Sequence, residues 1–284
     1  HGDTLFYFDE LIGNFLRFKL TEKKLYFSKV TGVNSKINFL VDEDSNINIQ
    51  FLVDALKSED TTKTSWHLQA NSFRFQNSQF VYHRTESMNK SYGIDFYRLK
   101  LFNLQLEAKD FQIFEGDVSF KIKNLSFEEE SGFIIDQFSA ETFIGKNDLN
   151  FTDLHLKTPY SELKADYFKM NFLNYQEFQD FNNNINLDWN IKSSKLNLSD
   201  IAYFSENLYG LHDNVYVTGE FFGRVGNLKG RNMLLKYLSE TFISGNFDIL
   251  GLPDSKNAFF FFDLKEFSSS ANDFKNIPKY PFYN

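Results

Sequence analysis

The chain has 284 residues, no cysteine and a formal net charge of −8. Without cysteine there is neither a disulfide framework nor a thiolate site. The acidic balance argues against nucleic acid as a partner, because phosphate binding needs a clustered positive surface. A mean hydropathy of −0.40 indicates a water-exposed surface, and the sequence lacks the run of about 18 apolar residues that predicts a transmembrane helix.

The composition favours β-strands. Phenylalanine occurs 36 times, against 4 prolines and 14 glycines, and aromatic and β-branched residues are enriched in strands. Taken in chain order, strands are predicted at 4–9, 24–41, 46–53, 66–82, 93–108, 116–127, 132–144, 148–157, 161–172, 182–198, 213–224, 241–250 and 258–267. Short turns separate them, so we expect neighbours in sequence to pair antiparallel.

Helices are expected to be few and short. Residues 198–204 offer a serine N-cap with an acidic residue in the first turn, and 175–181 carry aromatic residues at helical spacing. No Pro-rich, Gly/Ser-rich or charge-block linker divides the chain. We therefore expect one continuous architecture over 1–284, with a possibly irregular tail at 268–284.

The strongest feature is a two-residue alternation of apolar and polar side chains, clearest at 184–191. Because successive side chains of a strand point to opposite faces, this pattern predicts a sheet with one apolar and one polar face. Asn48, Lys121, Asn186 and Asp188 are expected to face water. The residues predicted to line the apolar face are Ile47, Ile49, Phe51, Val118, Phe120, Ile122, Ile185, Leu187, Trp189, Ile191, Val215 and Val217.

The alternation leaves two architectures open. A β-sandwich would bury the apolar face against a second sheet. A long antiparallel sheet that curls into an open groove would leave the face available to a ligand or partner.

Catalytic and metal-binding patterns are not found. The five histidines are scattered and none has metal-ligand spacing. The sequence has no nucleophile elbow and no phosphate-binding loop, and Glu128, Glu129 and Glu130 next to Ser131 and Gly132 are typical of a solvated hairpin turn. We therefore predict no enzyme activity, no metal and no cofactor.

Several segments resemble a known family when taken in order. They are LSFEEESGF at 125–133, LHLKTPYSEL at 154–163, LSDIAYF at 198–204 and GNFDILGLPD at 245–254. In this order the segments resemble the large TamB translocation and assembly modules of Bacteroidetes, within the AsmA-like and bridge-like lipid transfer superfamily. The resemblance covers roughly residues 2–267, while 277–284 fit none of its motifs.

The resemblance implies a curled antiparallel sheet whose concave apolar face carries phospholipid acyl chains between the inner and outer membranes. It further implies a periplasmic location, an inner-membrane anchor in a part not contained in this sequence, and an outer-membrane partner of the BamA/TamA type. The first residue is not methionine, and we expect the sequence to be a piece of a longer chain.

Two other functions fit the same pattern. Open sheet edges could capture nascent outer-membrane strands by β-augmentation, as a chaperone-like module would. A β-sandwich adhesin or carbohydrate-binding module is the third reading. A carbohydrate binder clusters Trp and Tyr at one site, whereas phenylalanine dominates here and is spread along the chain.

Overall fold

The computed structural model describes residues 4–44, 46–51, 66–85, 92–252, 254 and 256–276. It is all-β, with fifteen strands in mostly antiparallel sheet and a few short helices, as the sequence predicts. The chain divides into two compact units, residues 1–146 and 147–284. The expectation of one continuous architecture stays a prediction.

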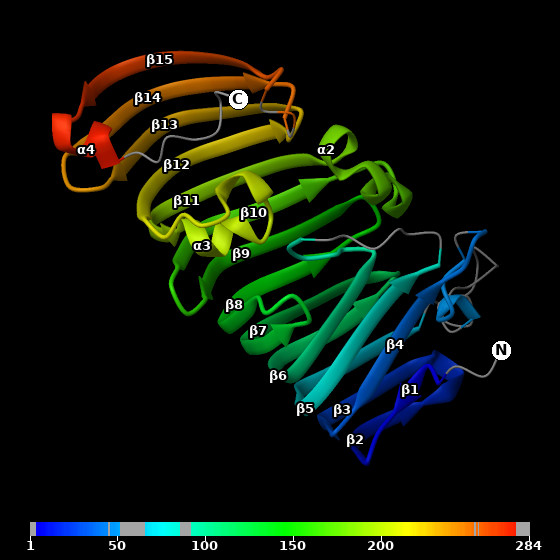
Figure 1. The fold of residues 1–284 in the computed structure, drawn as a ribbon. Helices are drawn as coiled ribbons and strands as arrows, with labels where there is room; N and C mark the ends of the chain where they lie inside the picture. Colours follow the sequence, from blue (N-terminus) through cyan, green and yellow to red (C-terminus); the bar gives the residue numbers. More distant parts are fainter. Residues whose placement is uncertain are drawn as a thin grey trace. The chain divides into compact units, whose positions relative to one another are not determined.

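The first unit holds strands β1 to β8 (Figure 1). Strands β3 and β4 both pair parallel with the long strand β5, whereas the other pairings are antiparallel. The sheet ends at β2, which pairs only with β3. The strands are β1 (Phe6–Tyr7), β2 (Glu10–Lys19), β3 (Lys24–Val33), β4 (Lys36–Val41), β5 (His67–Arg84), β6 (Arg98–Phe114), β7 (Asp117–Glu129) and β8 (Ile134–Ile144), with the 3-10 helix η1 at Leu20–Glu22.

The second unit is an antiparallel meander from β9 to β15. Each strand pairs with the next in sequence, and β15 at the end pairs only with β14. The strands are β9 (Asp148–Lys157), β10 (Glu162–Asn171), β11 (Asn186–Asn197), β12 (Asn214–Arg224), β13 (Asn227–Tyr237), β14 (Thr241–Leu250) and β15 (Phe259–Ser268).

Short helical segments connect some of these strands. They are η2 (Tyr175–Asp180), α2 (Phe181–Asn184), α3 (Leu198–Ala202), η3 (Glu206–Leu208) and α4 (Ala271–Asn276). The two predicted helices are confirmed, but the cap of α3 is Asn197, whose side chain accepts a hydrogen bond from the Ser199 amide. No helix in the described part of the chain is long and apolar enough to span a membrane.

The predicted strands differ from the observed ones at four places. The predicted strand 46–53 is wrong: Ile47 forms only an isolated bridge with Val41, and turn and helical conformations follow it as far as Phe51. Residues 52 and 53 lie outside the described residues. Strands β2 and β13 were not predicted, and 24–41 is two strands, since Asn34 turns the chain with φ 48°.

Bulges explain why β2 and β13 were missed. Leu16 in β2 is skipped by the pairing with β3, and the pairing of β13 with β14 shifts between Gly230 and Met233. An extra residue puts two apolar or two polar residues in succession, which interrupts the two-residue alternation. The sequence pattern of a strand is thereby lost although the strand continues.

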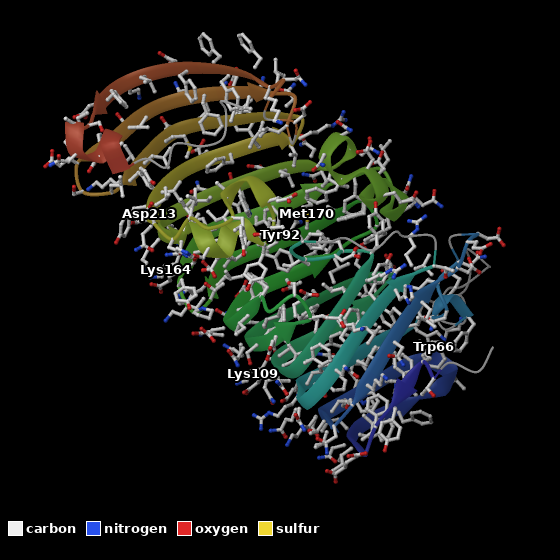
Figure 2. The ribbon with its side chains drawn as sticks, in the orientation of Figure 1. Trp66, Tyr92, Lys109, Lys164, Met170 and Asp213 are labelled. Carbon is white, nitrogen blue, oxygen red and sulfur yellow. The ribbon has the colours of Figure 1, made fainter. Side chains whose placement is uncertain are left out.

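Such bulges recur on successive strands of the second unit. The pairing shifts on β10 to β15, and Asp153, Gly219, Asn232 and Gly245 have positive φ. Bulges bend a strand and increase its twist, which accounts for the curved strands β12 to β15 in Figure 1. Lys164 and Met170 on β10 are six positions apart, and in a regular strand an even separation places both side chains on one face. The bulge between them places the two residues on opposite faces (Figure 2).

Candidate functional site

An aromatic row crosses the sheet of the second unit. Residues directly opposite each other in a sheet share a face, and the register aligns one residue from each strand β9 to β15. Neighbouring ring centroids in the row are 4.5 to 6.5 Å apart from Phe151 to Phe247. The row is Phe151, Phe168, Trp189, Phe221, Gly230, Phe247 and Phe262.

A second row beside it is made of aliphatic and glycine residues with one phenylalanine at the end. It consists of Leu149, Met170, Leu187, Gly223, Leu228, Ile249 and Phe260. No polar side chain occurs in either row. We call this side of the second unit, defined by the two rows, the apolar face.

The apolar face includes two buried clusters. Ile191, Val217 and Met233 form one of them, next to Trp189 and Phe221. Met170, Phe172 and Ile185 form the other, which is covered by Phe178 and Phe181 from the helical segment η2–α2. Helical residues therefore cover one end of the face.

Between these clusters and β15 the face is open. Phe168, Trp189, Phe221 and Phe247 are only half-buried. On β15 the exposed fraction of the side chains rises to 43% for Phe260 and 56% for Phe262. All described strands of the second unit belong to one pairing order, so none of them forms a second layer over this face. The alternative of a closed β-sandwich is thus not what the described strands form.

The opposite, polar face carries paired charges. Arg231 donates to Asp248 at 2.6 Å, and this hydrogen bond lowers the pKa of the Asp248 carboxyl. Lys192 lies 2.5 Å from Asp166, whose hydrogen bond and charge raise the pKa of the lysine. The two faces therefore differ in chemistry as the alternation predicts: one face carries charged side chains, and the other is apolar.

The first unit repeats this arrangement. Ring pairs connect Phe15 with Phe27, Phe73 with Phe111, and Phe111 with Phe120, with centroids 4.5 to 6.0 Å apart. On the other face Lys121 lies 2.7 Å from Glu141, and this hydrogen bond lowers the pKa of the glutamate. Each unit thus has an apolar face of its own.

The structure places nine of the twelve predicted residues on strands or beside them as the pattern requires. Leu187, Trp189 and Ile191 alternate with polar neighbours on β11, and Val215 and Val217 lie on the same face of β12. Ile185 is fully buried just before β11. Val118, Phe120 and Ile122 lie on β7, on the face opposite Lys121.

The other three residues are not on a strand. Ile47 and Ile49 lie in a bridge and a turn, and the Phe51 side chain is 66% exposed. Asn48 uses its side chain to bond the backbone at Leu40 and Asn38 instead of alternating with apolar neighbours. These hydrogen bonds close a turn. The segment alternates like a strand, but its polar positions include asparagine, which is typical of turns.

Sequence reasoning missed the rows at Gly223 and Gly230. Their apolar neighbours Leu187, Phe221, Leu228 and Phe247 lie on four different strands, and only the register brings them together. The signal that could have indicated them is the glycine itself, since glycine in a strand interior often marks a bulge or a close approach.

A buried polar cluster lies where α3 meets β10. Asp200 accepts hydrogen bonds from Thr158 at 2.6 Å and Ser161 at 2.5 Å, and Ser161 in turn accepts from the Asn197 amide. The neighbouring Ser199 contacts His212 at 2.8 Å, at the surface. Because Ser161 donates to a carboxylate and no described imidazole lies within hydrogen-bond distance of it, the described cluster fixes α3 and does not have the arrangement of a catalytic triad.

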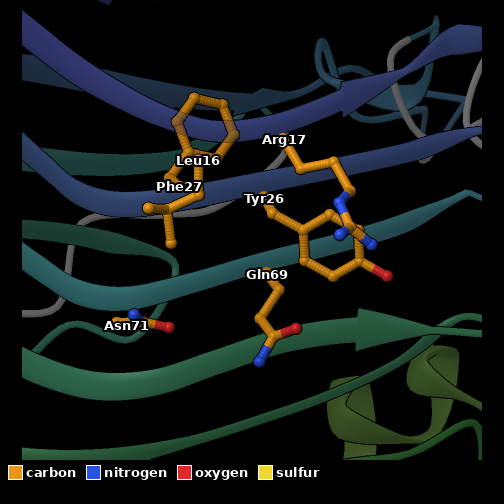
Figure 3. A pocket seen from close by; sticks show the side chains of 6 residues that line it. All are labelled: Leu16, Arg17, Tyr26, Phe27, Gln69 and Asn71. Atoms are coloured by element: carbon orange, nitrogen blue, oxygen red, sulfur yellow. The ribbon is translucent and has the colours of Figure 1, made fainter.

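Other possible sites are small. A hollow of about 300 Å³ opens beside β2, β3 and β5, where Arg17 extends toward Tyr26 (Figure 3). Its other lining residues are Leu16, Phe27, Gln69 and Asn71, so Arg17 is its single charged group. Within the described residues no group of His, Asp and Glu side chains is arranged to hold a metal ion.

No family model, curated protein or solved structure matches this chain.

Proposed function

We propose that this chain is a lipid-bridge segment that carries phospholipid acyl chains along its apolar face. The observation that supports the proposal best is the pair of apolar rows across seven strands, which contain no polar side chain and are not covered by another described strand of the second unit. Apolar surface of this extent is normally occupied by a ligand or partner.

The dimensions of the face suit an acyl chain. Six strand spacings of about 4.8 Å give each row a length of about 29 Å. One leaflet of a bilayer has a hydrocarbon thickness of about 15 Å, half of the core. A row is therefore long enough for an extended acyl chain, which gains about 0.8 kcal/mol for each methylene removed from water.

The chemistry suits sliding better than tight storage. Aromatic and aliphatic contacts are non-directional, so a chain can shift along the row without breaking hydrogen bonds. As the family resemblance implies, we place this activity in the periplasm, between the inner and outer membranes, with an outer-membrane assembly protein of the BamA/TamA type as partner. The proposal includes no catalytic role for the chain.

The test uses two arginine substitutions one position apart. Leu187→Arg places a charge within the second apolar row, where an acyl chain would have to desolvate it at a cost of several kcal/mol. Asn186→Arg adds the same charge on the exposed polar face. Native mass spectrometry should show phospholipid bound to the parent chain and to the Asn186 variant, with strong loss for the Leu187 variant.

Folding must be compared in the same preparations by circular dichroism. Equal lipid occupancy in the two variants, or none in the parent chain, would refute the proposal. Val217 is unsuitable for this test because its side chain is buried with Ile191 and Met233, so a charge there would unfold the cluster.

A second candidate function, capture of nascent outer-membrane strands, is favoured by the long free edge of β15. Unpaired N–H and C=O groups of an edge strand can pair with an added strand. Binding of unfolded outer-membrane protein by the Leu187→Arg variant would favour this function over lipid transfer.

A further inference from the structure

Among the described residues, two ten-residue strands have a free edge and are exposed along their whole length; the two-residue strand β1 is a further, short edge. Strand β2 pairs only with β3, and β15 pairs only with β14. Each has ten residues, and every one of them whose burial is described is exposed. The backbone N–H and C=O groups on the free edges are available to another strand.

Strand β15 carries apolar side chains on both of its faces, whereas β2 carries them mainly on one. In β15, Phe260 and Phe262 lie on the apolar face, while Phe259 and Phe261 pair with Leu250 and Asp248 and share the polar face. On β2, Ile12 lies opposite Thr31 on the face away from Phe15, and its neighbours on that face, such as Asn14, are polar. Strands that are apolar on both faces are typical of buried positions in a sheet.

The charges on the two edges are complementary. Interior charges pair across neighbouring strands, as Lys121 does with Glu141. Arg17 on β2 has no carboxylate partner among the described residues. Asp263 on β15 accepts only a 3.2 Å hydrogen bond from Asn246.

We propose that β15 of one copy of this chain pairs antiparallel with β2 of a second copy, with Arg17 opposite Asp263. The same register sets Phe18 opposite Phe262, and both belong to the apolar faces of their units. It also sets Gly13 opposite Phe267, a glycine–phenylalanine pair like Gly230 with Phe247. Leu16 and Lys265, which the existing pairings skip, come close to each other.

Other registers are less favourable. A slip of one residue would place the apolar side chains of one strand next to the polar side chains of the other. A slip of two sets Arg17 opposite either Phe261 or Lys265, so the ion pair is lost or becomes a repulsion. The contact is heterologous, because two different surfaces meet, and it leaves a free β2 and a free β15 at the ends of each assembly.

This inference goes beyond the proposed function, since the pairing needs backbone and side-chain contacts only and no lipid. It would also bring the apolar face of β15 beside that of β2 in the next copy. An acyl chain could then pass from one copy to another. The proposed pairing of β15 with β2 does not depend on that passage.

Disulfide trapping tests the register. The chain contains no cysteine, so single substitutions report one contact each. Under oxidation, an equimolar mixture of the Phe18→Cys and Phe262→Cys variants should form a mixed disulfide dimer, because opposed residues in antiparallel strands lie within disulfide reach. Phe18→Cys mixed with Phe259→Cys is the matched control, since Phe259 lies on the other face, and should give at most a tenth of that yield.

Sedimentation velocity tests the charge pair. The parent chain should form a concentration-dependent series of oligomers, Arg17→Asp and Asp263→Arg should each be monomeric, and a mixture of these two variants should associate again. Lys123→Asp on the interior strand β7 is the control and should associate like the parent chain. A parent chain that is monomeric at all concentrations, equal trapping with Phe259→Cys, or a predominant Phe262→Cys homodimer would each overturn the proposal.

Discussion

Gly230 lies directly opposite Phe247 on the neighbouring strand, and the phenylalanine ring occupies the space where a side chain at position 230 would be. A Cβ added to Gly230 would lie 2.5 Å from Cζ of that ring. The absent side chain lets the rings of Phe221 and Phe247 approach to 5.6 Å across the intervening strand. The first unit repeats the device at Gly32 and Phe75, where the added Cβ would lie 2.6 Å from Cδ1.

Gly230→Ala should therefore destabilise the chain. The methyl group must displace the Phe247 ring, and overpacking of this kind costs about 1–3 kcal/mol in the free energy of unfolding. Urea unfolding measures the loss. In Gly13→Ala, the control, the new Cβ would lie 3.3 Å from the Phe27 ring and should cost less.

Combining Gly230→Ala with Phe247→Leu separates this overlap from a general effect of glycine replacement. If the ring is the obstacle, the double variant should lose less stability than the sum of the two single variants. Strict additivity of the two losses would contradict the assigned contact.

Asp200 should be a main attachment of α3. Asp200→Ala would leave the buried hydroxyls of Thr158 and Ser161 without the acceptor they share. An unsatisfied buried polar group costs about 1–3 kcal/mol, and we expect a loss in that range by urea unfolding. Ser199→Ala removes a surface contact with His212 and a hydrogen bond donated to the Leu211 carbonyl, and because it leaves no shared acceptor missing it should cost less than Asp200→Ala, about 0.5–1 kcal/mol.

The sequence predicts the faces of the sheet better than its edges and bulges. Residues Leu187, Trp189 and Ile191 alternate without interruption, and their common face follows from the two-residue period alone. By contrast, Asn232 adopts φ 52° within β13 and shifts the alternation by one position. The position of such a bulge depends on how the strand pairs with its neighbours. The sequence of one strand does not show that pairing.

The candidate site was predictable to the same extent. The pattern indicates which residues are apolar and share a face, but the cross-strand row from Phe151 to Phe262 depends on six registers. A short alternation is also ambiguous, since 46–51 has the strand pattern yet Asn48 and Asp42 close a turn by hydrogen bonding to the backbone. Asn and Asp compete with the strand in this way.

Asp273 should make stability depend on acidic pH. Burial would by itself raise the pKa of this carboxyl, but hydrogen bonds from the Glu240 amide and from the hydroxyls of Thr241 and Ser239 lower it below the ordinary value. A carboxyl with a lowered pKa stabilises the fold above its unfolded pKa of about 3.9, and that stabilisation is lost as the pH falls through the folded value.

Asp273→Asn removes the titrating group. The variant should be less stable than the parent chain at neutral pH, and the difference should shrink below about pH 4. Urea unfolding at a series of pH values measures it, with Glu266→Gln on exposed β15 as the control. A difference that is independent of pH would contradict the role of the Asp273 charge.

Tyr237 should make stability depend on alkaline pH. Partial burial, a hydrogen bond donated to Asp213 at 2.9 Å and the charge of that aspartate raise the pKa of the phenol to about 12. The unfolded value is about 10. Because the neutral phenol is favoured in the fold, this stabilisation is complete below about pH 10 and is lost as the pH rises to about 12.

Tyr237→Phe should therefore unfold more readily than the parent chain near neutral pH, with a difference that decreases between about pH 10 and 12. The pKa of Tyr7 and of Tyr167 is also raised, so an ultraviolet titration of the folded parent chain should show a late phase whose amplitude falls by one tyrosine in the variant. Tyr216→Phe, at an exposed position of β12, is the matched control and should leave the late phase intact. If the amplitude of the late phase is the same in Tyr237→Phe as in the parent chain, the hydrogen bond to Asp213 does not have the assigned effect.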